Sequence, residues 1–216
     1  MKAVLFDAYG TLVRDDGLML VPGRIVADHG LSAPIDDVLR VWIDGYWAAT
    51  QRLPFRTLRE IQREILEATL RRFDAGADPT AYVELFFEVT TKVELYPEVP
   101  TVLAALSGTR TAVVSNADRE HLAAWTFTLP VEFVLVSEDV GAYKPDPRVF
   151  RAALERLQLE PHEVLHVGDS EVDDVMGAKA AGLRVAWVNR RGRARRPDLP
   201  EPDFEMRDLT ELPALL

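Results

Sequence analysis

The chain has 216 residues, of which 48% are hydrophobic, so we expect a folded protein with a substantial core, either one large domain or a domain with an insertion. Its net charge of -10 argues against a general nucleic-acid-binding protein, and the absence of cysteine excludes disulfides, thiolate metal sites and cysteine nucleophiles. A charge comes too early for a signal peptide, and no uncharged apolar stretch approaches the roughly 20 residues that span a membrane, so we expect a cytoplasmic protein with no membrane partner.

The first predicted strand, Ala3–Phe6, is a short apolar run that ends in a carboxylate, Asp7. An unbroken apolar run of this length is typical of a strand that is buried on both faces of a parallel sheet. Open α/β sheets bind ligands at the carboxyl ends of their strands, and a carboxylate there is costly to desolvate unless it is used. Asp7 is therefore the first candidate functional residue.

Residues 15–92 carry helical periodicity and no strand signal. Apolar residues recur at helical spacing in four stretches, which are residues 23–29, 35–51, 55–73 and 78–92. The last stretch opens with Asp78 and Pro79, a capping residue followed by proline at the first helical position. We therefore predict an all-helical block that is inserted after the first strand.

From Pro97 onward, predicted strands alternate with predicted helices. The strands are residues 111–116, 133–137, 163–169, 184–189 and 204–206. The helices are residues 101–106, a segment from 119, residues 146–157 and 172–181, and a short closing helix. This alternation indicates a parallel sheet with right-handed crossovers. The predicted fold class is α/β, a doubly wound parallel sheet formed by residues 1–14 and 93–216, with residues 15–92 as an inserted helical cap domain.

Polar residues follow four of the predicted strands, at the edge where such sheets bind ligands. They are Asp7, Ser115 with Asn116, Lys144, and Asp169 with Asp173 and Asp174. An aspartate can act as a nucleophile and form a covalent phosphoryl or acyl intermediate. Two carboxylates such as Asp7 and Asp169 can hold Mg²⁺ together with water and substrate oxygens. Mg²⁺ and Lys144 would then offset the repulsion between a carboxylate nucleophile and an anionic substrate.

Four segments together resemble the signature motifs of the haloacid dehalogenase superfamily. In chain order they are Asp7-Ala-Tyr-Gly-Thr11, Val113-Val-Ser115-Asn116, Tyr143-Lys144-Pro145 through Phe150, and His166-Val-Gly-Asp169-Ser170 through Asp174 to Gly177. Each motif is weak alone, but their order and the helical insertion after the first motif match the family over the whole chain. The resemblance implies a Rossmann-like core and a hydrolase.

This resemblance also implies roles for single residues. Asp7 would be the nucleophile. Ser115 and the backbone near Asn116 would hold the transferred group, and Lys144 would orient and neutralise it. Thr11, the last residue of the first motif, completes the predicted catalytic set.

The phosphatase members of this family bind a metal through the nucleophile, the backbone carbonyl two residues later and the first acidic residue of the fourth motif. The matching positions here are Asp7, Tyr9 and Asp169. Either Asp173 or Asp174 would support the metal from outside its ligand set, and the motif spacing favours Asp174. The resemblance therefore implies Mg²⁺ as the cofactor.

Two of the motifs imply different reactions. Tyr9 stands where most phosphatase members carry a second Asp that protonates the leaving group, and in this respect the first motif resembles the 2-haloacid dehalogenases. Those dehalogenases use no metal and have Ser at the position of Asp169. A carboxylate there, close to Asp7, would repel an anionic substrate unless a cation lay between them. Arg40 falls near the place of an active-site arginine in the dehalogenases, although arginines are common on helix surfaces.

Because we weigh the acidic cluster above Tyr9, we predict a Mg²⁺-dependent phosphatase that acts on a small phosphorylated metabolite through an aspartyl-phosphate on Asp7. The alternative is a 2-haloacid dehalogenase with an ester intermediate on Asp7, and a second alternative is a non-catalytic or regulatory binding protein of the same fold. The expected partner is a small anionic substrate. The basic run Arg190–Arg196 could attract it, although a solvated loop is the simpler interpretation. Both a monomer and a homodimer are compatible with the sequence.

Overall fold

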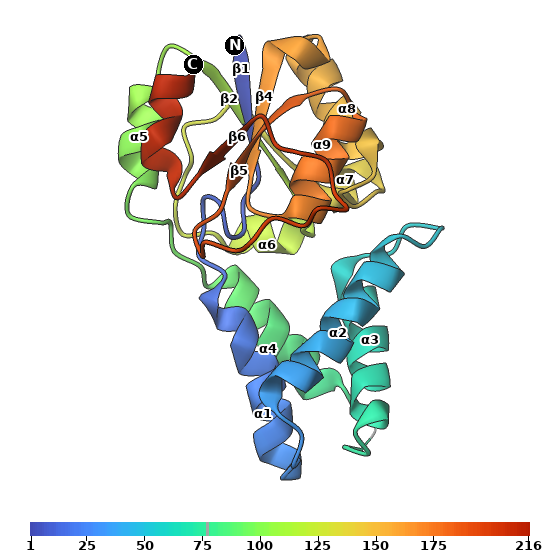
Figure 1. Ribbon diagram of the computed structural model, residues 1–216. Coiled ribbons are helices and arrows are strands. Elements are labelled where there is room, and N and C mark those ends of the chain that lie inside the picture. Colours follow the sequence, from blue (N-terminus) through green and yellow to red (C-terminus); the bar gives the residue numbers. More distant parts are fainter. Residues whose placement is uncertain (77) are drawn as a thin grey trace. The chain divides into compact units, whose positions relative to one another are not determined.

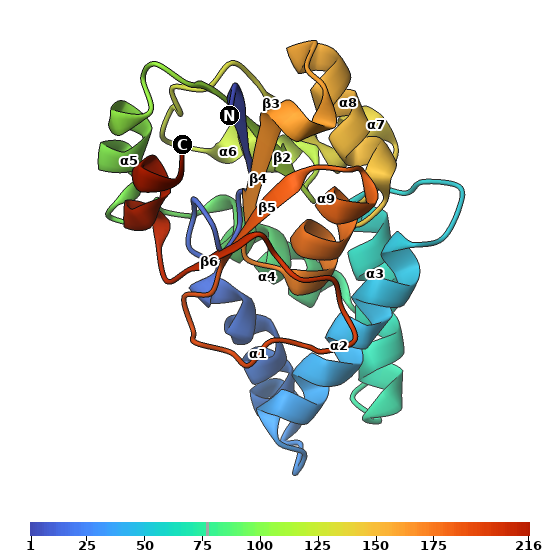
Figure 2. The same cartoon turned by 45° about the horizontal axis from the view of Figure 1, so that its top comes forward.

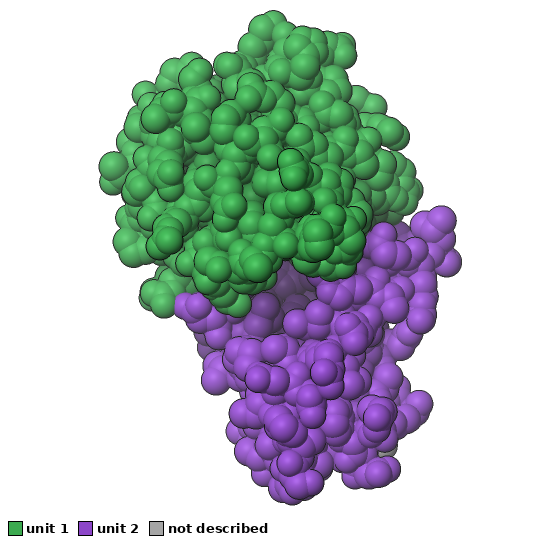
Figure 3. Space-filling view, viewed as in Figure 1, with its two compact units in different colours: residues 1–14, 94–116, 127–216 green, residues 15–93, 117–126 purple. Residues whose placement is uncertain are grey.

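The computed structural model describes residues 1–76 and 78–216, which form two compact units (Figure 3). The first, which we call the sheet unit, comprises residues 1–14, 94–116 and 127–216. The second, the helical unit, comprises the described residues of 15–93 together with 117–126.

Strand β1 (Ala3–Phe6) lies in the interior of a six-stranded sheet with the order β3-β2-β1-β4-β5-β6, in which all pairs are parallel (Figure 1). The other strands are β2 (Arg110–Ser115), β3 (Val134–Val136), β4 (Val164–Gly168), β5 (Arg184–Val188) and β6 (Phe204–Met206). All four side chains of β1 are 0% exposed, which explains why this strand has no polar residue on either face. The predicted α/β fold with a parallel sheet is confirmed.

Helices cover both faces of the sheet (Figures 1 and 2). One face is covered by α8 (Pro147–Leu157) and α9 (Gly177–Ala180), and the other by α5 (Val99–Ala105) and the C-terminal 3₁₀ helix η4 (Leu209–Leu215). The largest cluster of buried side chains joins alternate strand residues to α8 and α9. Because both faces are filled by apolar side chains, the carboxyl ends of the strands are where polar groups can gather.

Three short elements complete the sheet unit. They are α7 (Ser137–Val140), the 3₁₀ turn η2 (Pro161–Glu163) and the π-helical segment η3 (Glu171–Met176). The helix that we predicted over residues 172–181 is therefore a π-helical segment followed by the short α9, and α7 has no counterpart among the predicted elements. Both η3 and the loop after α7 carry residues of the candidate site.

The helical unit contains the four helices predicted over residues 15–92 with small shifts at their ends, the helix predicted from residue 119, and a 3₁₀ helix, η1, that was not predicted. They are η1 (Asp16–Met19), α1 (Leu20–His29), α2 (Ile35–Thr50), α3 (Leu58–Arg72), α4 (Thr80–Thr91) and α6 (Arg119–Ala124). Although α6 directly follows β2 in the chain, its segment groups with these helices. The carboxylate of Asp118 accepts hydrogen bonds from the backbone N–H groups of Leu58 (2.9 Å) and Arg59 (3.2 Å) at the start of α3, which ties the segment to the helical unit.

The chain leaves and re-enters the sheet unit along two paired segments. Val13 forms an antiparallel bridge with Leu95, the N–H of Arg14 donates to the carbonyl of Glu94 (2.9 Å), and the N–H of Tyr96 donates to the carbonyl of Leu12 (3.0 Å). The helical insertion therefore begins and ends at one place. None of the described helices has the length and apolar character required to cross a membrane.

Candidate active site

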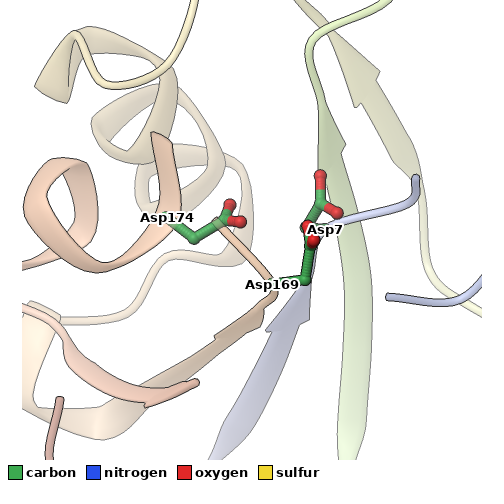
Figure 4. Close-up of side chains that lie close together, drawn as sticks. All are labelled: Asp7, Asp169 and Asp174. Carbon is green, nitrogen blue, oxygen red and sulfur yellow. The ribbon is translucent and has the colours of Figure 1, made fainter. Parts of the chain in front are cut away.

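Three carboxylates meet at the carboxyl edge of the sheet (Figure 4). Asp7 follows β1, Asp169 follows β4, and Asp174 belongs to η3. One oxygen from each lies within 4.8 Å of the others. Asp7 and Asp174 are buried and Asp169 is half-buried. The structure thus brings together the three acidic side chains that the sequence analysis assigned to one metal site.

Lys144 supplies a buried positive charge between two of these carboxylates. Its Nζ lies 2.6 Å from Oδ1 of Asp7 and 2.6 Å from Oδ1 of Asp174, and its side chain is only 2% exposed. Burial acts to lower the pKa of Lys144, but the charges of the carboxylates, with Asp174 the larger, raise it above its ordinary value. Lys144 therefore stays protonated, as neutralisation of an anionic group requires.

Asn116 holds Lys144 in place through its side-chain amide. The amide oxygen accepts from the N–H of Lys144 (2.7 Å) and from the hydroxyl of Ser137 (3.1 Å), while Nδ2 donates to the carbonyl of Lys144 (3.1 Å). The side chain of Asn116 is thus bound to both the N–H and the carbonyl of Lys144. Sequence reasoning missed this role because nothing in the motif spacing links the two residues.

Asp174 is held by three partners. Oδ1 contacts both Lys144 and Nε2 of His166 (2.9 Å), and Oδ2 accepts from the N–H of Ser170 (2.9 Å). Burial alone would raise the pKa of Asp174, but Lys144 and His166 lower it below its ordinary value. A Cβ on Gly168 would lie 2.2 Å from Cγ of Asp174, so only glycine fits there. Asp174 is therefore ionised and fixed in position.

Asp7 is held differently from Asp174. Burial raises the pKa of Asp7 to about 6, partly offset by the charge of Lys144. Its Oδ2 and the buried hydroxyl oxygens of Thr11 and Ser115 have no hydrogen-bond partner of good geometry among the described residues, although the Thr11 hydroxyl is close enough to Asp7 to act against the rise in its pKa. Buried polar atoms without a partner are rare in folded proteins and point to a missing ligand. The three atoms belong to residues that the sequence analysis placed at the site of group transfer.

Asp169 packs against the loop that carries the nucleophile. Gly10 has a φ of +84°, and a Cβ there would lie 2.7 Å from Cγ of Asp169. The carbonyl of Asp169 accepts from Nε1 of Trp187 (2.9 Å) and from the guanidinium of Arg193 (3.0 Å). Trp187 was not predicted as a site residue, because its contact depends on the register between β4 and β5, and Arg193 was named only as part of the basic run Arg190–Arg196.

Arg40, Tyr9 and Asp173 were also named in the sequence analysis. Arg40 is exposed on α2 and forms an ion pair with Asp37 (3.0 Å) within the helical unit. Tyr9 is half-buried and bridges to Val13 within the loop after β1. Asp173 lies beside Asp174, and burial raises the pKa of its carboxyl well above the ordinary value.

The donor set of this cluster fits a hard divalent cation. Mg²⁺ binds oxygen ligands, typically a few carboxylates together with water, and one oxygen of Asp7 lies within 4.8 Å of one oxygen of Asp169. Lys144 pairs with Asp7 and Asp174, and the half-exposed guanidinium of Arg193 lies 3.7 Å from Oδ2 of Asp169, so three carboxylates face two cations among the described residues and the cluster keeps an excess of negative charge. The residues therefore fit the metal that the fourth motif implies.

Comparison with known families identifies this arrangement. The sequence model of the haloacid dehalogenase-like hydrolases matches residues 1–182. The chain belongs to this family. Within it, the chain is 38% identical over 170 residues to the phosphoserine phosphatase of Thermus thermophilus, a match that spans 74% of the chain and 64% of that relative. It is also 26% identical to (S)-2-haloacid dehalogenase 1 of a Pseudomonas species, over 100% of the chain and 96% of the relative.

The haloacid dehalogenase-like fold is equally clear from solved structures. The L-2-haloacid dehalogenase from Xanthobacter autotrophicus superposes with a TM-score of 0.81 at 24% identity, covering 100% of the chain and 98% of that structure. This likeness shows the fold. Because the relatives include a phosphatase and a dehalogenase, family membership shows a hydrolase and leaves the choice between the two reactions to the site itself.

Proposed function

We propose that this haloacid dehalogenase-like hydrolase is a Mg²⁺-dependent phosphatase that acts on a small phosphorylated metabolite through an aspartyl-phosphate on Asp7. The observation that carries the proposal is the position of Asp169, whose carboxylate oxygen lies within 4.8 Å of those of Asp7 and Asp174. Lys144 and Arg193 offset part of the charge of the three carboxylates, and the remaining negative charge repels an anionic substrate unless a further cation binds. The relative from Thermus thermophilus, a phosphoserine phosphatase, supports the same reaction.

The proposed metal ligands are the carboxylates of Asp7 and Asp169 and the backbone carbonyl of Tyr9. Asp174 would support the metal while its own oxygens remain bound to Lys144, His166 and Ser170. When bound, Mg²⁺ would supply positive charge that attracts and neutralises the oxygens of the transferred phosphoryl group.

The chain's own residues then perform the transfer. The carboxylate of Asp7 attacks phosphorus, the bond to the leaving oxygen breaks, and an aspartyl-phosphate forms. The unpartnered hydroxyl of Ser115 donates to a phosphoryl oxygen, and the ammonium group of Lys144 neutralises its charge. Water then cleaves the bond between phosphorus and the Asp7 oxygen, which releases phosphate and restores the carboxylate.

We further propose that the helical unit is the cap domain that selects the substrate and excludes bulk water. In this family assignment, residues 15–93 take the place of the inserted cap. A cap restricts access to small molecules, which is the reason for expecting a metabolite as substrate.

The direct test is hydrolysis of an aryl phosphate with Mg²⁺, repeated after addition of a chelator. We expect turnover that depends on the metal, that is lost in Asp7→Asn and that falls by more than about 100-fold in Asp169→Asn, because each variant removes a proposed ligand. A matched control is Asp146→Asn, which removes a carboxylate that pairs with Arg148 in the sheet unit, outside the acidic cluster. Turnover that the chelator leaves unchanged would contradict the proposal.

A 2-haloacid dehalogenase is the second candidate, and Tyr9 is the observation in its favour. The dehalogenase from Pseudomonas matches the whole chain, and a halide leaves without needing a proton from the missing second Asp. This candidate predicts halide release from a 2-haloacid in the absence of metal. If a folded chain turns over neither phosphates nor 2-haloacids, the second alternative, a non-catalytic binding or regulatory protein, is favoured.

A further inference from the structure

Arg190 contacts the loop that carries the nucleophile. It follows β5 by two residues, and its guanidinium donates from Nε to the carbonyl of Gly10 (3.1 Å) and from a terminal nitrogen to the carbonyl of Thr11 (2.8 Å). Two parallel N–H groups of one planar fork thus hold two consecutive peptide units. Asp7 lies only three residues before Gly10.

The remaining face of Arg190 is also occupied. The guanidinium carbon lies 3.6 Å from the centre of the Tyr96 ring, and the third nitrogen lies 2.7 Å from Oε1 of Glu98. The side chains of Arg190 and Glu98 are each only 16% exposed. Two guanidinium nitrogens therefore donate to backbone carbonyls and the third forms an ion pair with Glu98, so the charge of Arg190 is used within the sheet unit.

The turn that presents Arg190 is itself held rigidly. Asn189 is buried, and its amide donates to the carbonyl of Arg193 (2.9 Å) and accepts from the N–H of the same residue (2.8 Å). Its backbone N–H donates to the carbonyl of Met206 in β6 (2.8 Å). A guanidinium on a turn fixed to two strands can hold a loop at a defined position.

From these contacts, we propose that Arg190 is a positioning residue for the reaction at Asp7. By fixing the peptide units of Gly10 and Thr11, it sets the direction in which the nucleophile and the carbonyl of Tyr9 point. Gly10 also lies against Asp169, so a shift of this loop would change the distance between the two carboxylates. The expected effect on enzymatic activity rests on the proposed function, whereas the expected effect on hydrogen exchange in this loop does not.

The test compares Arg190→Lys with wild type. Lysine keeps the positive charge but lacks the planar fork, so it cannot hold both carbonyls. Hydrogen exchange at the amides of residues 10–13 is measured first, without substrate or metal, and we expect exchange at least about tenfold faster in the variant. With an aryl phosphate and Mg²⁺, we expect kcat to fall at least about tenfold while KM changes by less than about twofold, because misplacement of a reacting group affects the transition state.

Arg184→Lys is the matched control. Arg184 opens β5 at the opposite end of the strand, is exposed, and lies 4.9 Å from the centre of the Phe204 ring, so it also loses a guanidinium–aromatic contact on substitution. We expect wild-type exchange at residues 10–13 and wild-type kcat in this variant.

The outcomes separate the inference from the proposed function. Unchanged exchange at residues 10–13 in Arg190→Lys overturns the inference, whether or not any substrate is turned over. A rise in KM at constant kcat that added salt abolishes also overturns it, since that result would make Arg190 a substrate-attracting charge. A wild-type chain that hydrolyses no phosphate overturns the proposed function alone, and faster exchange in the variant then still supports the positioning role.

Discussion

At the scale of single residues, the site combines a buried lysine with two carboxylates whose pKa values are shifted in opposite directions. Lys144 touches both Asp7 and Asp174, yet burial leaves Asp7 with a raised pKa while His166 and Lys144 hold Asp174 ionised. A carboxylate that is costly to keep charged is a better nucleophile than one whose oxygens are fully hydrogen-bonded. This difference agrees with the proposed roles, in which Asp7 attacks the substrate and Asp174 supports the metal.

The residue at position 9 allows a test of the missing general acid. We expect Tyr9→Asp to increase turnover of alkyl phosphates by about 10-fold or more, because a poor leaving group needs a proton that tyrosine does not supply from this position. Turnover of aryl or acyl phosphates should change less, since their leaving groups need less assistance. Steady-state rates on an alkyl and an aryl phosphate measure the ratio. Tyr9→Phe serves as the control, and equal alkyl and aryl turnover in wild type would count against the idea.

Gly10 provides a second residue-scale prediction. Gly10→Ala should lower Mg²⁺-dependent activity by at least about 10-fold and destabilise the fold by about 1–2 kcal/mol, because φ is +84° and the new Cβ would lie 2.7 Å from Asp169. Gly108→Ala is the control, since a Cβ at Gly108 has no neighbour within 4 Å among the described residues and its φ is not in the left-handed region. Activity and chemical denaturation are measured on both. Equal behaviour of the two variants would show that the close approach to Asp169 is unimportant.

At the scale of elements, the N-terminus of α3 depends on a residue about 60 positions away in the chain. Asp118→Ala removes the acceptor for the N–H groups of Leu58 and Arg59, and we expect a loss of about 1–3 kcal/mol in the free energy of unfolding. Asp78→Ala is the comparison, because Asp78 caps α4 locally through the N–H of Thr80 and is exposed. Its effect should stay below about 1 kcal/mol. Denaturant titration followed by far-UV circular dichroism distinguishes the two.

The contact between α6 and α4 introduces a pH dependence through His121. Its Nδ1 accepts from the N–H of Asp118 (3.2 Å) and its Nε2 contacts the hydroxyl of Thr90 (3.2 Å), which defines a neutral ring with the proton on Nε2. Burial lowers the pKa of His121 to about 4 from an ordinary value of 6.5. As the pH falls, His121 is therefore protonated near pH 6.5 in the unfolded chain, but only near pH 4 in the folded chain.

The stabilising contribution of neutral His121 is complete above pH 6.5 and is lost as the pH falls toward 4, by about 3 kcal/mol in total. Other buried groups titrate in the same range, so the measurement is the difference between wild type and His121→Gln across pH 4–7.5. This difference should shrink as the pH falls. In His162→Gln, which changes an exposed histidine, the pH dependence of wild type should be kept. A constant difference for His121→Gln would contradict the prediction.

At the scale of the whole molecule, metal binding should appear as stability. A ligand that binds only the folded state at about 100 times its dissociation constant stabilises it by about 2.7 kcal/mol, which for a chain of this size corresponds to roughly 5–10 °C in Tm. We expect Mg²⁺ to raise the Tm of wild type and not that of Asp169→Asn. Sodium chloride at equal ionic strength is the control. An equal shift in both proteins would place the effect outside the acidic cluster.

Local sequence determined the strands, the helical insertion and the identity of the acidic residues. These features depend on patterns that extend over only a few positions, which can be recognised in a sequence. They are the apolar run of β1, the capping residues of the helices and the motif spacings around Asp7 and Asp169. The ends of helices and the split of residues 171–180 into η3 and α9 were less predictable, because tertiary packing decides them.

Only the tertiary structure decided which groups support the active site. Asn116 holds the main chain of Lys144, Trp187 holds the carbonyl of Asp169, and Arg190 holds the loop after Asp7, across separations of 18 to 180 residues. The register of parallel strands and the path of the loops bring these partners together, and neither can be predicted from the spacing of residues in the sequence. The residues of the candidate site can therefore be predicted from short motifs. The contacts that hold them in place exist only once the sheet has formed.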